Sequence, residues 1–234
     1  MRLFRRALWP ACLLFACANV QALPYPDEAQ FRSAIAESTP LLKAENIGVE
    51  ILDARKEGLK RPLLAAGLSL KDRVCLIFFN TEPVADMQRF FDAMQPGDVR
   101  LWLNVLAVHE TAHCVEQRDA YLNKQFDKVL PPGYPYEGMN VQGYLSVVRS
   151  GAVEAWGEAF ADIAALLYLQ QQEPERWRQL AAQLLALRGE RAKLDPEHDT
   201  SPWLRKFIAG QPSMAPGQTI YERAFQLRRL YRPE

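Results

Sequence analysis

The sequence predicts an α+β fold that is mostly helical, with a small sheet near the N-terminus and a helical C-terminal half. Two short apolar runs of strand character, 48–54 and 73–80, lie in the first third of the chain. Most of the chain after residue 85 consists of longer segments with helical patterns. The 234 residues, 49% apolar and 24% charged, suit a single globular domain, which we place at 23–234.

Residues 1–22 have the composition of a secretory signal peptide. The basic stretch MRLFRR precedes the apolar run ALWPACLLFACA, and VQA offers small residues for cleavage before Leu23. This apolar run is too short to span a bilayer. We therefore expect an exported protein, periplasmic or secreted. Lipid attachment at Cys17 is the alternative that we favour less, because Phe15 fits a lipobox poorly, and we expect membrane association in that case alone.

The charge balance argues against a nucleic-acid partner. Lys plus Arg and Asp plus Glu number 28 each, and removal of Arg2, Arg5 and Arg6 with the signal segment leaves 25 basic residues against 28 acidic ones. A nucleic-acid-binding domain is expected to carry an excess of positive charge. We expect a mildly acidic mature protein and no nucleic-acid partner.

Cys75 and Cys114 are the cysteines that remain after residue 22. In an oxidising compartment a single pair of cysteines tends to form a disulfide. Such a bond would join the strand at 73–80 to the helix that carries Cys114. Two buried thiols that never meet are the alternative, because the sequence does not give their separation. We favour the disulfide.

The predicted elements before residue 125 come in the following order. A first helix at 26–38 has acidic residues near its N-terminus, and Pro40 lies beyond its end. The strands at 48–54 and 73–80 follow, the second apolar enough to be covered on both faces. A short helix at about 85–94 stops at QPGD, and Asp98 then caps a long helix from about 99 into the low 120s.

The second half of the chain is predicted to be helical after one loop. The stretch KVLPPGYPYEGMN (128–140) contains three prolines and two glycines, which exclude regular structure. Helices are then expected at about 151–171, 174–193, 202–209 and 218–230. Pro174 is the expected N-terminal residue of the second of these.

The stretch His109-Glu110-Thr111-Ala112-His113 lies on the long predicted helix, and the chain holds three histidines in all. Residues i and i+4 share one face of a helix, so His109 and His113 can direct two imidazoles at one metal ion. Glu110 remains close enough to reach a water molecule on that metal, as in HExxH metalloproteases. A histidine pair without metal is the alternative. The uncharged neighbours on either side favour the metal.

A catalytic zinc site requires a third protein ligand and an open position for water. Asp119, six residues beyond His113, is disfavoured because no glycine turns the chain between them. The helix at 151–171 offers better candidates, the carboxylates of Glu154, Glu158 and Asp162, spaced four apart on one face.

The residues around these three carboxylates are apolar on all sides, which is typical of a buried helix. An isolated buried charge is very costly, and no Lys or Arg occurs from 150 to 175. A metal with its histidines would supply the missing partners. A solvated acidic edge is the alternative, and the two interpretations agree if that edge faces a wet cleft.

His109–His113 followed by Glu158-Ala159-Phe160-Ala161-Asp162 resembles the gluzincin metallopeptidases, in which HExxH precedes ExxxD on a later helix. The resemblance covers about a quarter of the chain. It implies a zincin-like fold, with the small sheet packed on the HExxH helix, and one Zn²⁺ per chain. It also implies that Glu110 is the base, that His109, His113 and Glu158 are the metal ligands, and that Asp162 orients a ligand histidine.

The gap between the two motifs leaves the subfamily open. The 44 residues between His113 and Glu158 exceed the gap in thermolysin-like enzymes. Glu154 therefore remains a second candidate for the third ligand.

These residues predict an exported zinc peptidase that acts on protein or peptide substrates, with a zinc-bound water activated by Glu110. The oxyanion needs a further donor. His198 is the candidate for this catalytic role, and Tyr134, Tyr136 and Tyr144 compete for it.

Two other functions remain open from the sequence. One is a zinc-stabilised envelope binding protein without catalysis, and the other is a zinc amidase acting on cell-wall peptides. For a peptidase, the strand at 73–80 is expected to be an edge that pairs with extended substrate. A central strand would explain its apolar character equally well.

Overall fold

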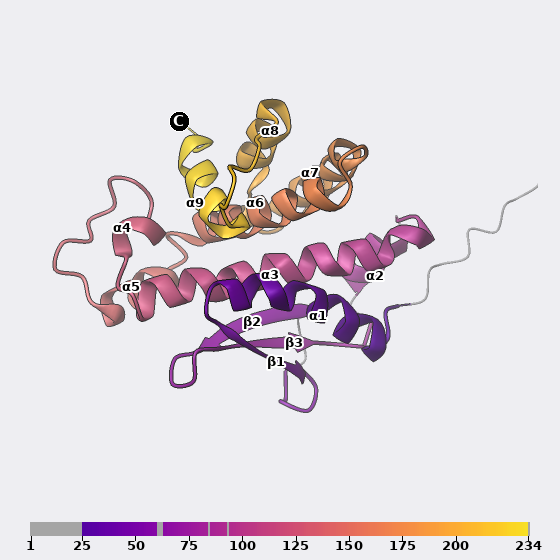
Figure 1. The fold of residues 1–234 in the computed structure, drawn as a ribbon, viewed down its shortest axis with the longest axis horizontal. Coiled ribbons are helices and arrows are strands. Elements are labelled where there is room, and N and C mark those ends of the chain that lie inside the picture. Colours follow the sequence, from indigo (N-terminus) through magenta and orange to yellow (C-terminus); the bar gives the residue numbers. More distant parts are fainter. Residues whose placement is uncertain (1–24, 60–62, 84, 93, 234) are drawn as a thin grey trace, which may run out of the picture.

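The computed structural model describes residues 25–59, 63–83, 85–92 and 94–233 (Figure 1). The predicted signal segment 1–22, with Cys17, lies outside these ranges. Within them the fold is α+β and mostly helical with one small sheet, as predicted, and that sheet has three strands. None of the helices in the described ranges has the length and apolar character needed to cross a membrane. The elements are α1 (Glu28–Ala44), β1 (Gly48–Asp53), β2 (Leu64–Ser69), β3 (Val74–Phe79), α2 (Ala85–Asp92), η1 (Pro96–Asp98), α3 (Val99–Tyr121), α4 (Phe126–Val129), α5 (Val141–Arg149), α6 (Glu154–Gln172), α7 (Trp177–Ala192), η2 (Pro196–His198), α8 (Ser201–Gly210) and α9 (Ile220–Leu230).

The sheet has the strand order β1-β3-β2. β1 runs parallel to β3, with Gly48 opposite Val74, and β2 runs antiparallel to it, with Leu64 opposite Phe79. The strand predicted as a substrate-binding edge is therefore the central strand, because both of its sides are already paired. β2 was missed, since LAAGLS contains no β-branched or aromatic residue and forms a strand through its pairing with β3.

Burial along β3 alternates rather than covering both faces equally. Cys75, Ile77 and Phe79 are fully buried, and the residues between them are partly buried. The buried face of β3 is the one that meets the helices, which is the ordinary pattern of a sheet covered mainly on one side.

The helix α3 lies between the two layers of the molecule. Figure 1 shows α1 and the sheet on one side of α3, and α6 to α9 on the other. α3 packs against α1, β2 and α6. Trp102, Leu103, Val105 and Val108 on α3 are buried and form part of one continuous core. A helix with neighbours on both sides can bury polar side chains as well as apolar ones.

The disulfide between Cys75 and Cys114 is formed, as predicted, and the two Cα atoms are 5.7 Å apart. It ties the central strand β3 to α3. Cys114 directly follows His113, so the covalent link lies next to the second histidine of the HETAH sequence.

The first helix extends further than predicted. α1 starts with a capping box between Asp27 and Gln30, but it continues through Pro40 to Ala44. Proline costs a helix one hydrogen bond. Leu42, beyond the proline, is fully buried, and its burial stabilises the last turn.

Other details of the helices differ from the prediction. Asp98 occupies the N-cap position of α3 but makes no capping hydrogen bond, and its carboxylate lies 3.1 Å from the guanidinium of Arg176 instead. That arginine is the N-cap residue of α7, which therefore begins at Trp177 and not at Pro174.

The short helices α4 and α5 were missed. α5 is capped by Asn140, whose side chain accepts from the backbone of Gly143 at 2.9 Å.

Candidate metal centre

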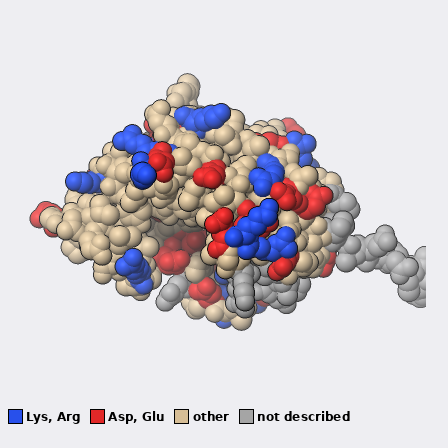
Figure 2. Space-filling model, turned by 90° about the horizontal axis from the view of Figure 1, so that it is seen from below, with Lys and Arg blue, Asp and Glu red and all other residues tan. Residues whose placement is uncertain are grey.

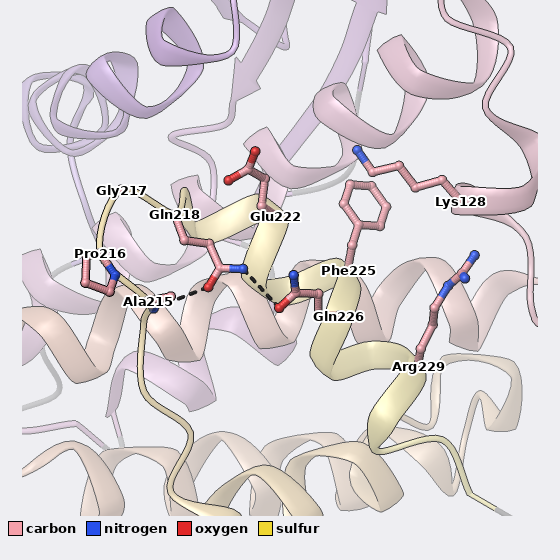
Figure 3. A pocket seen from close by; sticks show the side chains of 9 residues that line it. All are labelled: Lys128, Ala215, Pro216, Gly217, Gln218, Glu222, Phe225, Gln226 and Arg229. Atoms are coloured by element: carbon pink, nitrogen blue, oxygen red, sulfur yellow. Dashed lines mark hydrogen bonds between the residues drawn. The ribbon is translucent and has the colours of Figure 1, made fainter.

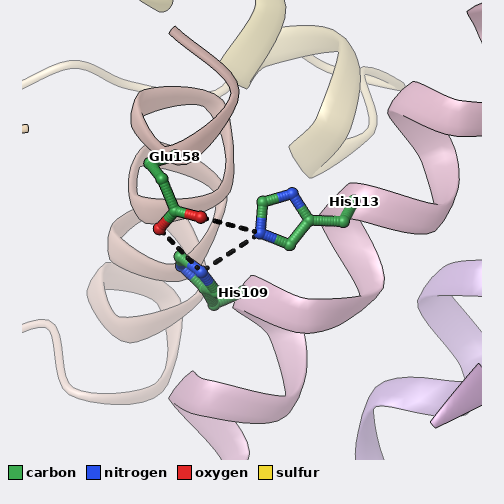
Figure 4. Close-up of side chains that lie close together, drawn as sticks. All are labelled: His109, His113 and Glu158. Atoms are coloured by element: carbon green, nitrogen blue, oxygen red, sulfur yellow. Dashed lines mark hydrogen bonds and ion pairs between the residues drawn. The ribbon is translucent and has the colours of Figure 1, made fainter. Parts of the chain in front are cut away.

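The two packed helices α3 and α6 bring His109, His113 and Glu158 together (Figure 4). The Nε2 atoms of the two histidines are 3.3 Å apart. Each of them lies 3.4 Å from one oxygen of the Glu158 carboxylate. Figure 4 shows all three side chains pointing to one common position between the helices.

These distances fit a zinc ion. Zinc binds histidine nitrogen at about 2.0–2.1 Å and carboxylate oxygen at about 2.0–2.2 Å in tetrahedral geometry, which places neighbouring ligand atoms about 3.3–3.5 Å apart. The three separations of 3.3, 3.4 and 3.4 Å fall in this range. They are longer than ordinary hydrogen bonds of about 2.7–3.2 Å. Two imidazoles and a carboxylate are also the donor types that zinc prefers, and they leave the fourth position open for water.

Asp162 lies one turn beyond Glu158 on α6 and holds His109 from the other side of the ring. Its Oδ1 atom is 2.9 Å from Nδ1 of His109, and its side chain is almost fully buried. A carboxylate in this position fixes the ring so that Nε2 could be presented to a metal ion. Thr200, at the N-cap of α8, donates its hydroxyl to Oδ2 of Asp162 at 2.5 Å.

Arg188 on α7, like Thr200, is a residue of this centre that the sequence analysis missed. Its Nε and Nη2 atoms donate to the two Asp162 oxygens at 2.8 and 2.6 Å, and Nη2 also lies 3.1 Å from Glu158. α6 contains no Lys or Arg of its own. Two of its carboxylates nevertheless have a cationic partner, because Arg188 lies on the next helix and contacts them. The signal was available, since Arg188 follows the buried Ala181 and Leu184 on the same face of α7.

The electrostatics of the cluster favour positive charge between α3 and α6. Burial disfavours the charged imidazole of His109, but Glu158 and Asp162 outweigh it and raise the pKa of His109 to about 10. Burial also disfavours the carboxylate of Asp162, yet Arg188 and His109 hold its pKa at about 2. The two histidines, against the effect of burial, keep the pKa of Glu158 well below its ordinary value. A divalent cation would satisfy the same carboxylates.

Glu110 is partly buried on α3, beside the two histidines. No hydrogen bond or ion pair to another described residue engages its carboxylate. Burial raises the pKa of Glu110, while the positive charges of His109 and His113 oppose this rise. A free carboxylate with a raised pKa is suited to accept and return a proton.

His198 also lies at the centre. Its Nε2 atom is 3.1 Å from Glu154, and its Nδ1 atom is 2.8 Å from Asp195. Glu154, Glu158 and His198 each offer an atom within 4.8 Å of the others. Of the two candidates for the third ligand, Glu158 is thus the one placed against His109 and His113, and Glu154 is placed against His198.

The remaining candidates are engaged elsewhere or lie to one side. Asp119, disfavoured as a ligand, is fully buried and accepts from Asn123 at 2.9 Å and from Lys128 at 2.5 Å. Tyr144 is buried in the wall of a cavity that also borders His113 and Glu158. Tyr136 is exposed and Tyr134 is partly buried in the loop after α4.

A larger surface cavity of about 570 Å³ is a weaker candidate site (Figure 3). Phe225 and Arg229 of α9 line it, and Lys128 of α4 lies across from them, with its ammonium 4.2 Å from the Phe225 ring centre. The carboxylate of Glu222 in its wall accepts from the backbone of Thr219 in a capping box. The lining includes no histidine and none of the metal-centre residues.

The charged surface is mixed rather than dominated by one sign. Figure 2 shows Lys and Arg interspersed with Asp and Glu on the face seen from below, where acidic side chains also lie in a recess.

Comparison of the chain with protein-family models, with curated proteins and with solved structures found no match. The case for a function therefore depends on the residues of the centre itself.

Proposed function

We propose that this protein is an exported zinc peptidase of the gluzincin type, with His109, His113 and Glu158 as metal ligands. The observation that carries the proposal is the set of three ligand atoms 3.3–3.4 Å apart, contributed by an HExxH helix and a later helix. In this proposal Glu110, on the same helix as the two histidines, is the base. Asp162, on the same helix as Glu158, orients His109. A zincin-like fold is part of the proposal, supported by a small sheet that packs on α3 through β2.

Zinc in this position would polarise the scissile carbonyl group and lower the pKa of the attacking water. Glu110 takes the proton from that water as its oxygen forms the new bond to the carbonyl carbon. Glu110 then passes the proton to the amine that leaves when the carbon–nitrogen bond breaks. Asp195 holds Nδ1 of His198, and in this proposal Nε2 exchanges its contact with Glu154 for the oxyanion of the substrate, to which it donates.

The substrate chain is proposed to lie along β2, in place of the strand at 73–80. The backbone N–H of Leu68 faces away from β3 and donates to the side chain of Gln117 on α3 at 2.8 Å. In an antiparallel strand the groups of alternate residues face the same way, so those of Leu64 and Ala66 share this direction. An extended peptide added at this edge would run beside the HETAH helix.

The cysteine pair supports the proposed export. A disulfide between two internal elements is the expected state in an oxidising compartment and is rare in the cytosol. It agrees with a signal peptide at 1–22, which remains a sequence-based proposal.

Elemental analysis of chain 23–234 after dialysis tests the metal, with Glu158→Ala beside the wild type and Glu175→Gln as an exposed acidic control. One zinc per chain is expected in the wild type and the control, with a clear loss in Glu158→Ala. No zinc in the wild type would refute the proposed centre. Zinc retained in Glu158→Ala would move the third ligand elsewhere.

Cleavage of casein by wild type and Glu110→Gln tests the reaction. The wild type is expected to cleave casein, while Glu110→Gln keeps its zinc and loses activity. Equal activity would remove Glu110 from the mechanism. A zinc protein that cleaves neither casein nor cell-wall peptides would be a binding protein, and one that cleaves wall peptides alone would be an amidase.

A further inference from the structure

Beyond the proposed metal ligands, α3 and α6 make another close contact, between Glu116 and Gly157. Glu116 lies three residues after His113 on α3, so the two share a face of that helix. Gly157 directly precedes Glu158 on α6. A Cβ atom at Gly157 would lie 3.2 Å from Oε2 of Glu116, which is closer than most such contacts. The glycine thus lets a carboxylate of α3 approach the backbone of α6 beside the centre.

Arg228 of α9 holds this carboxylate and α6 at the same time. Its Nη1 atom donates to Oε1 of Glu116 at 2.5 Å and to the backbone carbonyl of Trp156 at 3.0 Å. Its Nη2 atom lies 3.3 and 3.4 Å from the carbonyl oxygens of Lys128 and Val129. The guanidinium therefore connects α3, α6 and the end of α4. Because the group is planar and rigid, its contacts fix directions as well as distances.

The burial of this charge needs an explanation. The Arg228 side chain is fully buried, and the rings of Trp156, Phe160 and Phe225 surround it, with centroids 4.3–5.1 Å from the guanidinium carbon. Burial lowers the pKa of Arg228, although Glu116 opposes this effect. Apolar residues in place of a buried ion pair often give equal or higher stability. Stability alone is thus a weak reason for the pair, and a fixed geometry is a stronger one.

Geometry matters here because the proposed ligands come from the two helices that Arg228 connects. Nε2 of His113 on α3 and Oε1 of Glu158 on α6 are 3.4 Å apart, a separation that suits tetrahedral zinc. Glu116 lies three residues after the histidine, and Trp156 lies two residues before the glutamate. A small movement of α3 against α6 at these contacts would change the separation of the ligand atoms.

We propose that Arg228 is a positioning residue of the metal centre. With Glu116 it fixes the spacing of α3 and α6 beside Gly157, so that ligand atoms from the two helices stay at the separations that zinc requires. It acts through the two helices and not on the metal itself. The inference rests on the proposed function, because it concerns how the proposed ligands are held.

A variant that keeps the core stable but lacks the ion pair separates positioning from stability. Glu116→Leu with Arg228→Met replaces the pair by apolar side chains, so the metal-free variant is expected to unfold at or above the wild-type midpoint. Its zinc affinity, measured by competition with a chelator, is expected to fall about tenfold or more. Cobalt(II) bound in place of zinc should show a changed visible spectrum, because its absorption depends on coordination geometry.

The control for this variant is Glu190→Leu with Lys193→Met, which removes an exposed ion pair at the end of α7. It should leave the zinc affinity and the cobalt spectrum unchanged.

Gly157→Ala tests the same spacing with the ion pair intact. The added methyl group meets the Glu116 carboxylate, which Arg228 keeps from turning aside, so zinc affinity is expected to fall at least several-fold. Gly189→Ala on α7 is the control, because its new methyl group would lie in open space. Both substitutions bring a similar gain in helix propensity. A loss in Gly157→Ala alone therefore arises from the contact between α3 and α6.

A folded double variant with the zinc affinity and cobalt spectrum of the wild type would overturn the inference. So would zinc binding by Gly157→Ala as tight as that by Gly189→Ala, and this comparison decides if the double variant does not fold. None of these measurements needs hydrolysis. Variants that respond as expected in a protein that cleaves no peptide refute the proposed activity alone. A peptidase whose variants bind zinc like their controls refutes the positioning role alone, and a wild type without zinc overturns both.

Discussion

Arg188 on α7 and Asp162 on α6 form a two-pronged ion pair, with nitrogen–oxygen distances of 2.8 and 2.6 Å. The same guanidinium lies 3.1 Å from Glu158. Arg188 thus connects the proposed metal ligand to the carboxylate that orients His109. Paired contacts of this kind fix geometry as well as charge, because both groups are planar.

Removal of this arginine should destabilise the metal-free protein. Arg188→Ala removes one cationic partner of two poorly exposed carboxylates, and breaking one side of a buried ion pair costs about 3–5 kcal/mol. Denaturant unfolding of the metal-free variant should show a loss of this order, and zinc should recover part of it by supplying positive charge. Arg178→Ala, an exposed arginine on the same helix, is the control. A variant as stable as the control would show that Arg188 is dispensable.

Replacement of the orienting carboxylate should weaken metal binding without removing it. Asp162→Asn keeps the shape of the side chain but loses the charge that holds His109, and such partners are worth about 10–100-fold in metal affinity. Competition with a zinc chelator measures the change, with the exposed Asp127→Asn as the control. Unchanged zinc affinity in Asp162→Asn would contradict the orienting role.

The pKa of Asp162 makes the metal-free protein sensitive to acid. Burial opposes its charge, but Arg188 and His109 lower the pKa from 3.8 to about 2. A depressed carboxyl pKa contributes stability above the unfolded pKa, and this contribution is lost as the pH falls through the folded pKa. We expect a loss of about 2 kcal/mol between pH 4 and pH 2, from about 1.4 kcal/mol per pKa unit. Unfolding of the wild type and Asp162→Asn across this range should show a shallower pH dependence in the variant.

The disulfide should contribute several kcal/mol to stability. Cys75 and Cys114 are 39 residues apart, and a closed loop of this length is worth about 3–4 kcal/mol in the chain-entropy account. Reduction of the wild type should lower its unfolding midpoint, and the double variant Cys75→Ser with Cys114→Ser should resemble the reduced protein. The double variant should not respond to reductant. A wild type that is equally stable with and without reductant would contradict the expectation.

His198 should affect turnover and not metal content. His198→Phe removes the donor proposed for the oxyanion, and loss of one such donor costs about 10²–10³ in kcat. Zinc content should stay at the wild-type level, because the imidazole of His198 is not among the three proposed ligands. Zinc loss in the variant would instead place His198 in the metal site, together with Glu154.

The sequence predicts best those parts of the centre that depend on a single helix. His109 and His113 share a face because they are four residues apart, and Glu158 and Asp162 share a face of α6 for the same reason. Their placement together was inferred from the cost of burying carboxylates, and the structure agrees. The zinc and the activity remain predictions.

Several features that depend on contacts between elements were missed. Arg188 joins the centre through the packing of α7 on α6, which no pattern within α6 indicates. β2 forms because β3 offers a partner, although its residues have low strand propensity. The continuation of α1 through Pro40 depends on the tertiary burial of Leu42.

The helices α4 and α5 lie in the chain between α3 and α6 and contribute none of the proposed metal ligands. Val129, at the end of α4, and Tyr144 and Val148, on α5, nevertheless form part of the wall beside the centre. The proposed metal ligands and part of the wall beside them thus come from separate stretches of sequence. Exchange of the segment 122–153 for one of different composition would change the surroundings of the proposed centre while leaving its ligands in place, which makes this stretch the natural target for redesign.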